Sequence, residues 1–199
     1  MDSLSGNYAF CFSSGLFFMK KERLGPIKRV YKGTIFNILQ RDVFFPNGRK
    51  KLFEYCVRPD SVTILPFDDK GRLLLIKEYR HGFKKNVWFL PAGRVDKGET
   101  PLQAAKRELR EETELGARIF KKVYQKSPSN TLIWDIHIYA AKDLFPAPLK
   151  GDEDYPIKVV PTPFAKALKM ALDGTIKNEF IAFHIIKFDY MLKDGQFKW

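Results

Sequence analysis

The stretch that decides the fold reads GRVDKGETPLQAAKRELREETELG, residues 93–116. Its centre brings the carboxylates Glu108, Glu111 and Glu112 together on what we expect to be one helix. Like charges three or four residues apart weaken a helix by a few tenths of a kcal/mol per pair. A bound divalent cation would relieve this repulsion, because hard ions such as Mg²⁺ prefer carboxylate oxygens. The alternative is a solvated acidic face balanced by the neighbouring lysine and arginines.

The helix is specified by its own sequence. Thr100 can act as N-cap, Pro101 suits the first helical position, and Gln103 completes a Thr-x-x-Gln capping box. The apolar stripe predicted to pack on a sheet consists of Leu102, Ala105 and Leu109.

The spacing of fixed residues in this stretch resembles the Nudix box, G-x5-E-x7-R-E-U-x-E-E-x-G-U, in which U is apolar. Gly93 opens the match, and every fixed position agrees except one. Glu114 stands where the box has a glycine, and a glycine follows only at Gly116. Because that glycine normally leaves the helix in a left-handed conformation, the departure bears on the exit turn and not on the carboxylates before it.

The resemblance implies an α/β Nudix fold, with a mixed β-sheet core sandwiched by helices. It also implies two or three Mg²⁺ or Mn²⁺ ions held against a diphosphate. By the resemblance, Glu108 and Glu112 are the principal metal ligands and Glu111 is a third. Arg107 orients the acidic cluster, and Glu99 is the supporting acid at the helix entrance. Such ions would let a P–O–P linkage be hydrolysed near neutral pH without a covalent nucleophile.

The residues before the box narrow the resemblance to the ADP-ribose pyrophosphatase branch. The segment LPFDDKGRLLLIKEYRHGFKKNVWFLPAGRVDKGE carries a Tyr-Arg pair and a LPAG turn. In that branch the main-chain carbonyl of the alanine at Ala92 completes the coordination of one metal, and the arginine at Arg80 grips the diphosphate. Phe89 stands where many relatives have glutamate. The implied substrates are ADP-ribose and other nucleoside diphosphate sugars.

A later acidic loop, DLFPAPLKGDEDYP at 143–156, resembles the corresponding loop of bacterial ADP compounds hydrolases. In ADP-ribose pyrophosphatases this loop brings a catalytic glutamate over the metals. We therefore expect Glu153 to be the general base, with Asp152 and Asp154 as alternatives.

The rest of the sequence indicates that the chain has two structural regions. Residues 1–60 form an N-terminal β extension with a strand over 29–45 and a hairpin turn at 46–48, and residues 61–199 form the hydrolase domain with the box at 93–115. The β-rich stretches of the second region lie between 61 and 160. The expected helices begin at Pro163 and at about Asn178. The second is predicted to bury Phe180, Ile181, His184, Ile185 and Phe188.

In the pyrophosphatase branch the N-terminal strands often cross to a partner subunit. The resemblance therefore implies a domain-swapped homodimer in which Phe53 or Tyr31 lies over the nucleobase and Arg58 reaches the site. Each of the three also suits an ordinary sheet position. His137 and Trp134 lie in an apolar run and are interpreted as packing residues.

Composition sets the broad limits. A chain of 199 residues with 45% hydrophobic residues suits one buried core, and the net charge of +12 suits a solvated lysine-rich surface or an anionic small molecule. No motif favours nucleic acid or a membrane span. Cys11 and Cys56 lack ligand spacing, which favours free thiols and a cytoplasmic location. Residues 1–18 are interpreted as an extra strand or as the product of a start assigned before Met19.

Two other functions remain open at this point. The resemblance to ADP compounds hydrolases allows hydrolysis of NADH or diadenosine polyphosphates. A Nudix-fold regulator that binds nucleotide or RNA without catalysis is the alternative of another class, although such a protein has no need of the complete set of carboxylates.

Overall fold

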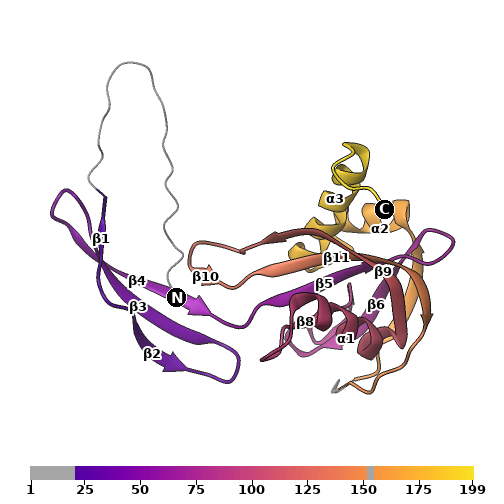
Figure 1. The fold of residues 1–199 in the computed structure, drawn as a ribbon, viewed down its shortest axis with the longest axis horizontal. Helices are drawn as coiled ribbons and strands as arrows, with labels where there is room; N and C mark the ends of the chain where they lie inside the picture. The colour runs from indigo at the N-terminus through magenta and orange to yellow at the C-terminus, as the bar shows by residue number, and fades with distance from the viewer. Residues whose placement is uncertain (1–20, 152–154) are drawn as a thin grey trace, which may run out of the picture.

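The computed structural model describes residues 21–151 and 155–199 (Figure 1). Within these residues the chain forms curled mixed sheets and three helices, so the predicted α/β class is confirmed. The apolar segment 8–19 and Cys11 lie outside the described residues. None of the described helices has the combined length and apolar character needed to cross a bilayer.

A mixed sheet forms the centre of the molecule. Its order is β8-β5-β11-β9, with β5 and β11 parallel and the other neighbours antiparallel. Its strands are β5 (Ser61–Pro66), β8 (Ala92–Arg94), β9 (Leu115–Lys126) and β11 (Ile136–Pro146).

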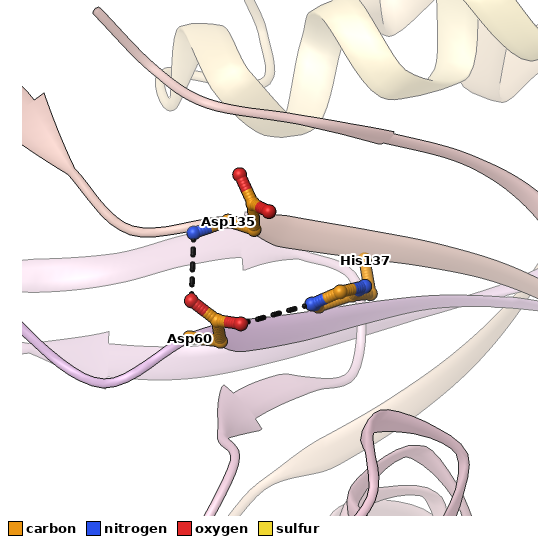
Figure 2. Close-up of side chains that lie close together, drawn as sticks. All are labelled: Asp60, Asp135 and His137. Atoms are coloured by element: carbon orange, nitrogen blue, oxygen red, sulfur yellow. Dashed lines mark hydrogen bonds and ion pairs between the residues drawn. The ribbon is translucent and has the colours of Figure 1, made fainter. Parts of the chain in front are cut away.

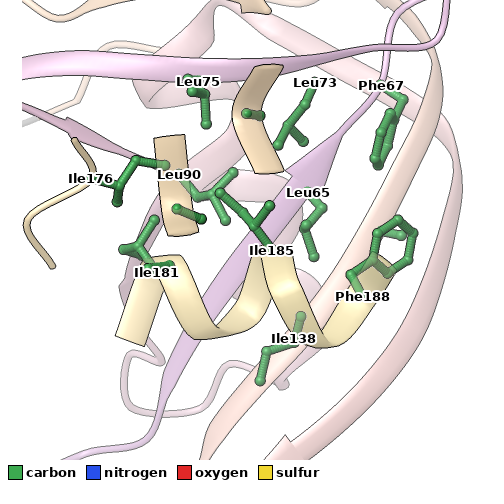
Figure 3. Close-up of a cluster of buried hydrophobic side chains, with 14 of the residues drawn as sticks. Leu65, Phe67, Leu73, Leu75, Leu90, Ile138, Ile176, Ile181, Ile185 and Phe188 are labelled. Atoms are coloured by element: carbon green, nitrogen blue, oxygen red, sulfur yellow. The ribbon is translucent and has the colours of Figure 1, made fainter. Parts of the chain in front are cut away.

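Helices cover both faces of this sheet, as the sequence predicted. Helix α1 (Pro101–Thr113) packs on one face, and α2 (Phe164–Leu172) and α3 (Glu179–Lys193) cover the other. Successive residues of a strand point to opposite faces, so Ile64 of β5 packs under α1 and Leu65 packs under α3. The larger of the two cores, drawn in Figure 3, includes Leu65, Leu75, Leu90, Ile138, Ile185 and Phe188.

A second sheet follows the central one, and the chain enters it from β5 through a tight turn. Asp68 makes the turn, since its Oδ1 accepts the N–H groups of Lys70 at 3.0 Å and Arg72 at 2.8 Å, and Gly71 takes a φ of +70°. The sheet that follows has the order β12-β6-β7, and β6 carries Glu78 and Arg80 toward the end of α1. Its elements are β6 (Arg72–Arg80), η1 (His81–Phe83), β7 (Lys85–Phe89) and β12 (Lys158–Pro163).

The N-terminal strands form a separate sheet that projects away from the body (Figure 1). The single strand expected over 29–45 is wrong, because the chain turns between β2 (Lys28–Lys32) and β3 (Asn37–Phe44). In this turn the Gly33 N–H donates to the Phe36 carbonyl at 2.9 Å. The hairpin at 46–48 is present, with Gly48 at a φ of +81°. This arm consists of β1 (Arg23–Leu24), β2 (Lys28–Lys32), β3 (Asn37–Phe44), β4 (Lys50–Val57) and β10 (Leu132–Ile133).

Two predicted core positions are exposed. Leu102 lies on the expected stripe of α1 but in its first turn, where the packed face ends, and it is 38% exposed. Ala104 is buried beside Ala105 instead, because two small side chains let the helix lie close to the sheet. Phe180 is 43% exposed, while the other four predicted residues of α3 are buried. The prediction for Phe180 was wrong because the first turn of α3 borders a cleft and not a neighbouring element.

Candidate active site

The start of α1 is fixed by the predicted capping box. The Thr100 side chain accepts the Gln103 N–H at 3.3 Å, and the Gln103 side-chain oxygen accepts the Thr100 N–H at 2.8 Å. Pro101 occupies the first turn. This local bonding sets where the helix begins, and therefore how its later residues face the sheet.

The end of α1 forms without the glycine that the box prescribes. Glu114 takes the left-handed conformation, with φ of 61° and ψ of 15°, and its N–H donates to the Arg110 carbonyl. A non-glycine residue costs about 1 kcal/mol in this conformation. The Ala147 N–H donates to the Glu114 carbonyl at 2.9 Å and ties the exit to the end of β11. The departure from the box therefore leaves the helix exit in its usual form.

Arg107 organises the acidic cluster. Its Nη1 donates to Glu108 at 2.7 Å and to Glu111 at 2.8 Å, and its Nε donates to Glu99 at 2.9 Å. Its Nη2 donates to the Arg94 carbonyl at 2.9 Å. The bond from Arg107, and a weaker one from the Asp96 N–H, hold the pKa of Glu99 below its ordinary value. The carboxylates in turn hold the pKa of Arg107 above its own ordinary value. The guanidinium thus fixes acids from the loop and the helix in one geometry.

Gly93 provides the space in which the Glu108 carboxylate lies. A Cβ at this position would come closer than 3.0 Å to three atoms of that carboxylate. Glu108 itself is 8% exposed. A glycine is therefore required here by the close approach between β8 and the Glu108 side chain.

Glu112 is the most deeply placed of the box carboxylates. It accepts the Ala92 N–H at 2.9 Å, which fixes one of its oxygens. Burial raises the pKa of Glu112 well above its ordinary value, and the nearby Glu108 and Glu78 add to that effect. A buried group of like charges binds a divalent cation readily, because the ion removes both the repulsion and the cost of burial. The residues present therefore fit an Mg²⁺ or Mn²⁺ site.

Glu78 is a member of this cluster that the sequence reasoning missed. It pairs with Arg80, whose Nε donates to it at 2.6 Å, and both residues lie two apart on β6 and so share one face. The signal was the Glu-x-Arg spacing on a predicted strand. Phe89, at the position where many relatives carry glutamate, lies 4.7 Å from the Arg80 guanidinium and supports it through its ring.

A cleft of about 520 Å³ brings most of the predicted residues together. Arg58 lies on its wall in the same chain, whereas Phe53 does not line it and packs against Phe45 with ring centroids 6.3 Å apart. Tyr31 lies exposed on the arm. Glu153, Asp152 and Asp154 lie outside the described residues. The predicted residues on the cleft wall are Arg58, Arg80, Ala92, Gly93, Arg107, Glu108 and Glu112.

A second set of metal-type side chains, Asp60, Asp135 and His137, lies where β5 and β11 begin (Figure 2). Asp60 accepts the Asp135 N–H at 2.8 Å and pairs with His137 Nε2 at 3.2 Å. Asp135 in turn accepts from Gln125 and Ser127, both at 2.6 Å. All four carboxylate oxygens of Asp60 and Asp135 therefore have hydrogen-bond partners, and these bonds link the starts of the parallel strands β5 and β11. His137 is buried, as predicted for a packing residue.

Comparison with known proteins decides the family. The NUDIX domain family matches residues 57–161, a range that contains the whole box and the arginines of the cleft. This chain belongs to the NUDIX family.

Two curated proteins and one solved structure show which NUDIX proteins it is similar to. An ADP-ribose pyrophosphatase of Bacillus subtilis (strain 168) is 30% identical over 146 residues, covering 72% of this chain and 79% of that protein. The ADP compounds hydrolase NudE of Escherichia coli (strain K12) is 32% identical over 160 residues, covering 78% and 84%. The crystal structure of an ADP compounds hydrolase superposes with a TM-score of 0.76 at 27% identity, covering 90% of this chain and 98% of that one. The fold predicted from the box is thereby confirmed.

Proposed function

We propose that this NUDIX protein is a metal-dependent pyrophosphohydrolase that cleaves the diphosphate bond of ADP-ribose or a related nucleoside diphosphate sugar. The products are a nucleoside monophosphate and a sugar phosphate. The observation that carries the proposal is the buried cluster of Glu108, Glu112 and Glu78 beside Arg80, in a cleft large enough for a nucleotide. The names of both curated relatives support hydrolysis of ADP-containing substrates.

The residues of this chain divide the work. Glu108, Glu112 and Glu111 would hold Mg²⁺ or Mn²⁺, with the Ala92 carbonyl as a further ligand, and Arg107 keeps Glu108 and Glu111 aligned. When bound, the ions would neutralise the bridging phosphate oxygens and polarise phosphorus toward attack by water. Arg80 presents a planar guanidinium to the diphosphate.

Glu153 is proposed as the general base that takes the proton of the attacking water. Tyr155 and Pro156, the described residues that follow the acidic loop, line a second cavity of about 430 Å³ together with Glu111 and Glu112. The Tyr155 ring also packs on Tyr79 of β6, with centroids 4.8 Å apart. The described residues that follow the acidic loop therefore lie beside Glu111 and Glu112, which supports the proposed role of the loop.

We further propose that the enzyme acts as a homodimer in the cytoplasm. The arm exposes apolar side chains that a monomer would leave in water, and a second copy of the chain would cover them. The free thiol of Cys56 suits a reducing compartment. The exposed apolar residues of the arm are Leu24, Ile27, Val30, Tyr31, Ile35, Phe36, Leu52 and Ile133.

Light scattering tests the dimer. Leu52→Glu together with Tyr31→Glu places charges on the arm and should convert the dimer to a monomer, whereas Leu172→Glu, at a residue 67% exposed on α2, should not. A wild-type monomer at micromolar concentration with full activity would contradict the proposed assembly.

A substrate panel tests the reaction. ADP-ribose, UDP-glucose, GDP-mannose, NADH and diadenosine tetraphosphate are incubated with Mg²⁺ or Mn²⁺, and products are detected through a coupled phosphatase. We expect ADP-ribose to yield AMP and ribose 5-phosphate. Hydrolysis of NADH in preference to ADP-ribose would favour the second candidate function, a dinucleotide hydrolase. Absence of hydrolysis from the whole panel would contradict the proposal and favour a binding protein.

A further inference from the structure

The cleft has an aromatic end that the proposed reaction does not use. The acidic cluster occupies one part of the wall, and side chains from the start of α3 and from the segment before β11 occupy another. These side chains are Trp134, Asn178, Phe180, Ile181 and His184, and Arg58 from the connection between β4 and β5 joins them.

We propose that this aromatic end binds the base of a nucleoside diphosphate within a single chain, with Trp134 and Phe180 as stacking walls and His184 as a hydrogen-bond donor. The proposal rests on the diphosphate hydrolase function proposed above, and it assigns base recognition to residues outside the arm.

Trp134 is held as a rigid platform. The Arg58 guanidinium lies 5.3 Å from its ring, and the Phe36 ring lies 6.3 Å away, centroid to centroid. The indole Nε1 is buried and has no hydrogen-bond partner among the described residues. Among the described residues, the Arg58 side chain donates only to the Pro59 carbonyl, at 3.4 Å. Two residues that line the cleft therefore carry N–H groups that no described acceptor satisfies: the buried indole N–H of Trp134 and the terminal Nη groups of Arg58.

Phe180 is exposed for a local reason. Asn178 caps α3 by accepting the Ile181 N–H at 3.1 Å, which fixes the first turn of the helix with the Phe180 ring on the cleft wall. Phe183, one turn later, is also 43% exposed but does not line the cleft. An exposed phenylalanine fixed on a cleft wall offers a face on which a flat base can stack.

His184 presents a defined donor. Burial lowers the pKa of His184 to about 4, so its ring is neutral at neutral pH, and burial raises the pKa of Tyr124, so the phenol keeps its proton. The Tyr124 hydroxyl lies 2.6 Å from His184 Nδ1. Because a phenol is the stronger donor and an imidazole nitrogen the stronger acceptor, the hydroxyl donates to Nδ1. The ring proton then sits on Nε2, which no other described residue engages.

The sheet register gives the distance between the two parts of the cleft. Gly93 and His137 both pair with Val62, on opposite sides of β5, so they are about 10 Å apart across two strand spacings. Trp134 precedes His137 by three residues, about 10 Å along an extended chain. The backbone of the aromatic end is therefore roughly 14 Å from the acidic cluster. Trp134 and Glu108 both line the cleft, so their side chains approach one another across this gap.

Phe180→Ala tests the proposal with little risk to folding, and Phe183→Ala is its matched control. Loss of one stacking face should raise KM for ADP-ribose about 5- to 150-fold with a much smaller change in kcat. Phe183→Ala should behave as wild type. Equal KM values for the two variants would overturn the proposal.

A measurement without turnover separates this proposal from the reaction. Titration with AMP in EDTA should quench tryptophan fluorescence in the wild type and in Trp88→Phe, and the quenching should be lost in Trp134→Phe. Quenching with no hydrolysis of any panel substrate would contradict the proposed function and leave the base site supported. Quenching that is the same in Trp134→Phe, or absent from the wild type, would overturn the base site.

Discussion

Gly93→Ala should inactivate the enzyme without unfolding it. The new methyl group would come closer than 3.0 Å to three atoms of the Glu108 carboxylate, whereas non-bonded heavy atoms rest at about 3.5–4.0 Å. The carboxylate would have to move by more than about 1 Å. Because it ends a flexible side chain, and because Gly93 is not among the positive-φ glycines, the backbone can accept alanine and the damage falls on the site.

The expected loss follows from that displacement. A misplacement of about 1 Å costs roughly 10²-fold in rate, equivalent to about 2.7 kcal/mol of transition-state stabilisation. The assay is kcat/KM for ADP-ribose at saturating Mg²⁺, with the melting temperature of each variant measured alongside.

Gly82→Ala is the control, since a Cβ there meets nothing within 4 Å and φ is ordinary. We expect wild-type activity from this control. A Gly93→Ala enzyme with kcat/KM within about twofold of wild type, when a displaced ligand should cost roughly 10²-fold, would refute the assignment of Glu108 to the metal site.

Three further predictions concern individual side chains. Glu112→Gln should raise the melting temperature of the metal-free protein at pH 8, because burial raises the pKa of Glu112 and disfavours its charged form. The gain should vanish below about pH 4.5, where the carboxyl is protonated in both the folded and the unfolded state. Equal melting temperatures of the two proteins at pH 8 would contradict this prediction. The pKa of His184 is about 4 in the folded state against 6.5 in the unfolded state, so the folded state binds fewer protons between these pH values. The free energy of unfolding of the wild type, measured by denaturant titration, should therefore rise by up to about 3 kcal/mol from pH 4 to 6.5 relative to His184→Gln. Parallel pH dependences for the two proteins would refute this prediction. Glu153→Gln should lower kcat by about 10²–10⁴-fold with little change in KM, and an unimpaired variant would move the base to Asp152 or Asp154.

The parts of the structure that depend on near neighbours could be predicted from the sequence. The Thr100 and Gln103 capping pair and the turn at Asp68 are made by residues within four positions of each other, so their chemistry is visible in the sequence. The carboxylates of α1 were found because the box spacing places them within one turn of each other.

The parts that depend on distant neighbours could not be predicted. Periodicity places Phe180 on an apolar stripe but does not tell where the neighbouring element ends, so the cleft beside it was missed. Glu78 shares a strand face with Arg80, yet its approach to Glu112 joins elements far apart in the chain. The sequence left open what form the helix exit takes at Glu114, because the hydrogen bond from the Ala147 N–H that ties this turn to β11 comes from a residue distant in sequence.

The central claim is that the carboxylates of α1 hold divalent ions over a diphosphate. Electron paramagnetic resonance of Mn²⁺, titrated with a methylene analogue of ADP-ribose present, counts the bound ions directly. The wild type should bind two or three ions per chain, and Glu108→Gln combined with Glu112→Gln should bind none at the same concentrations. An unchanged number of bound ions in the double variant would contradict the account.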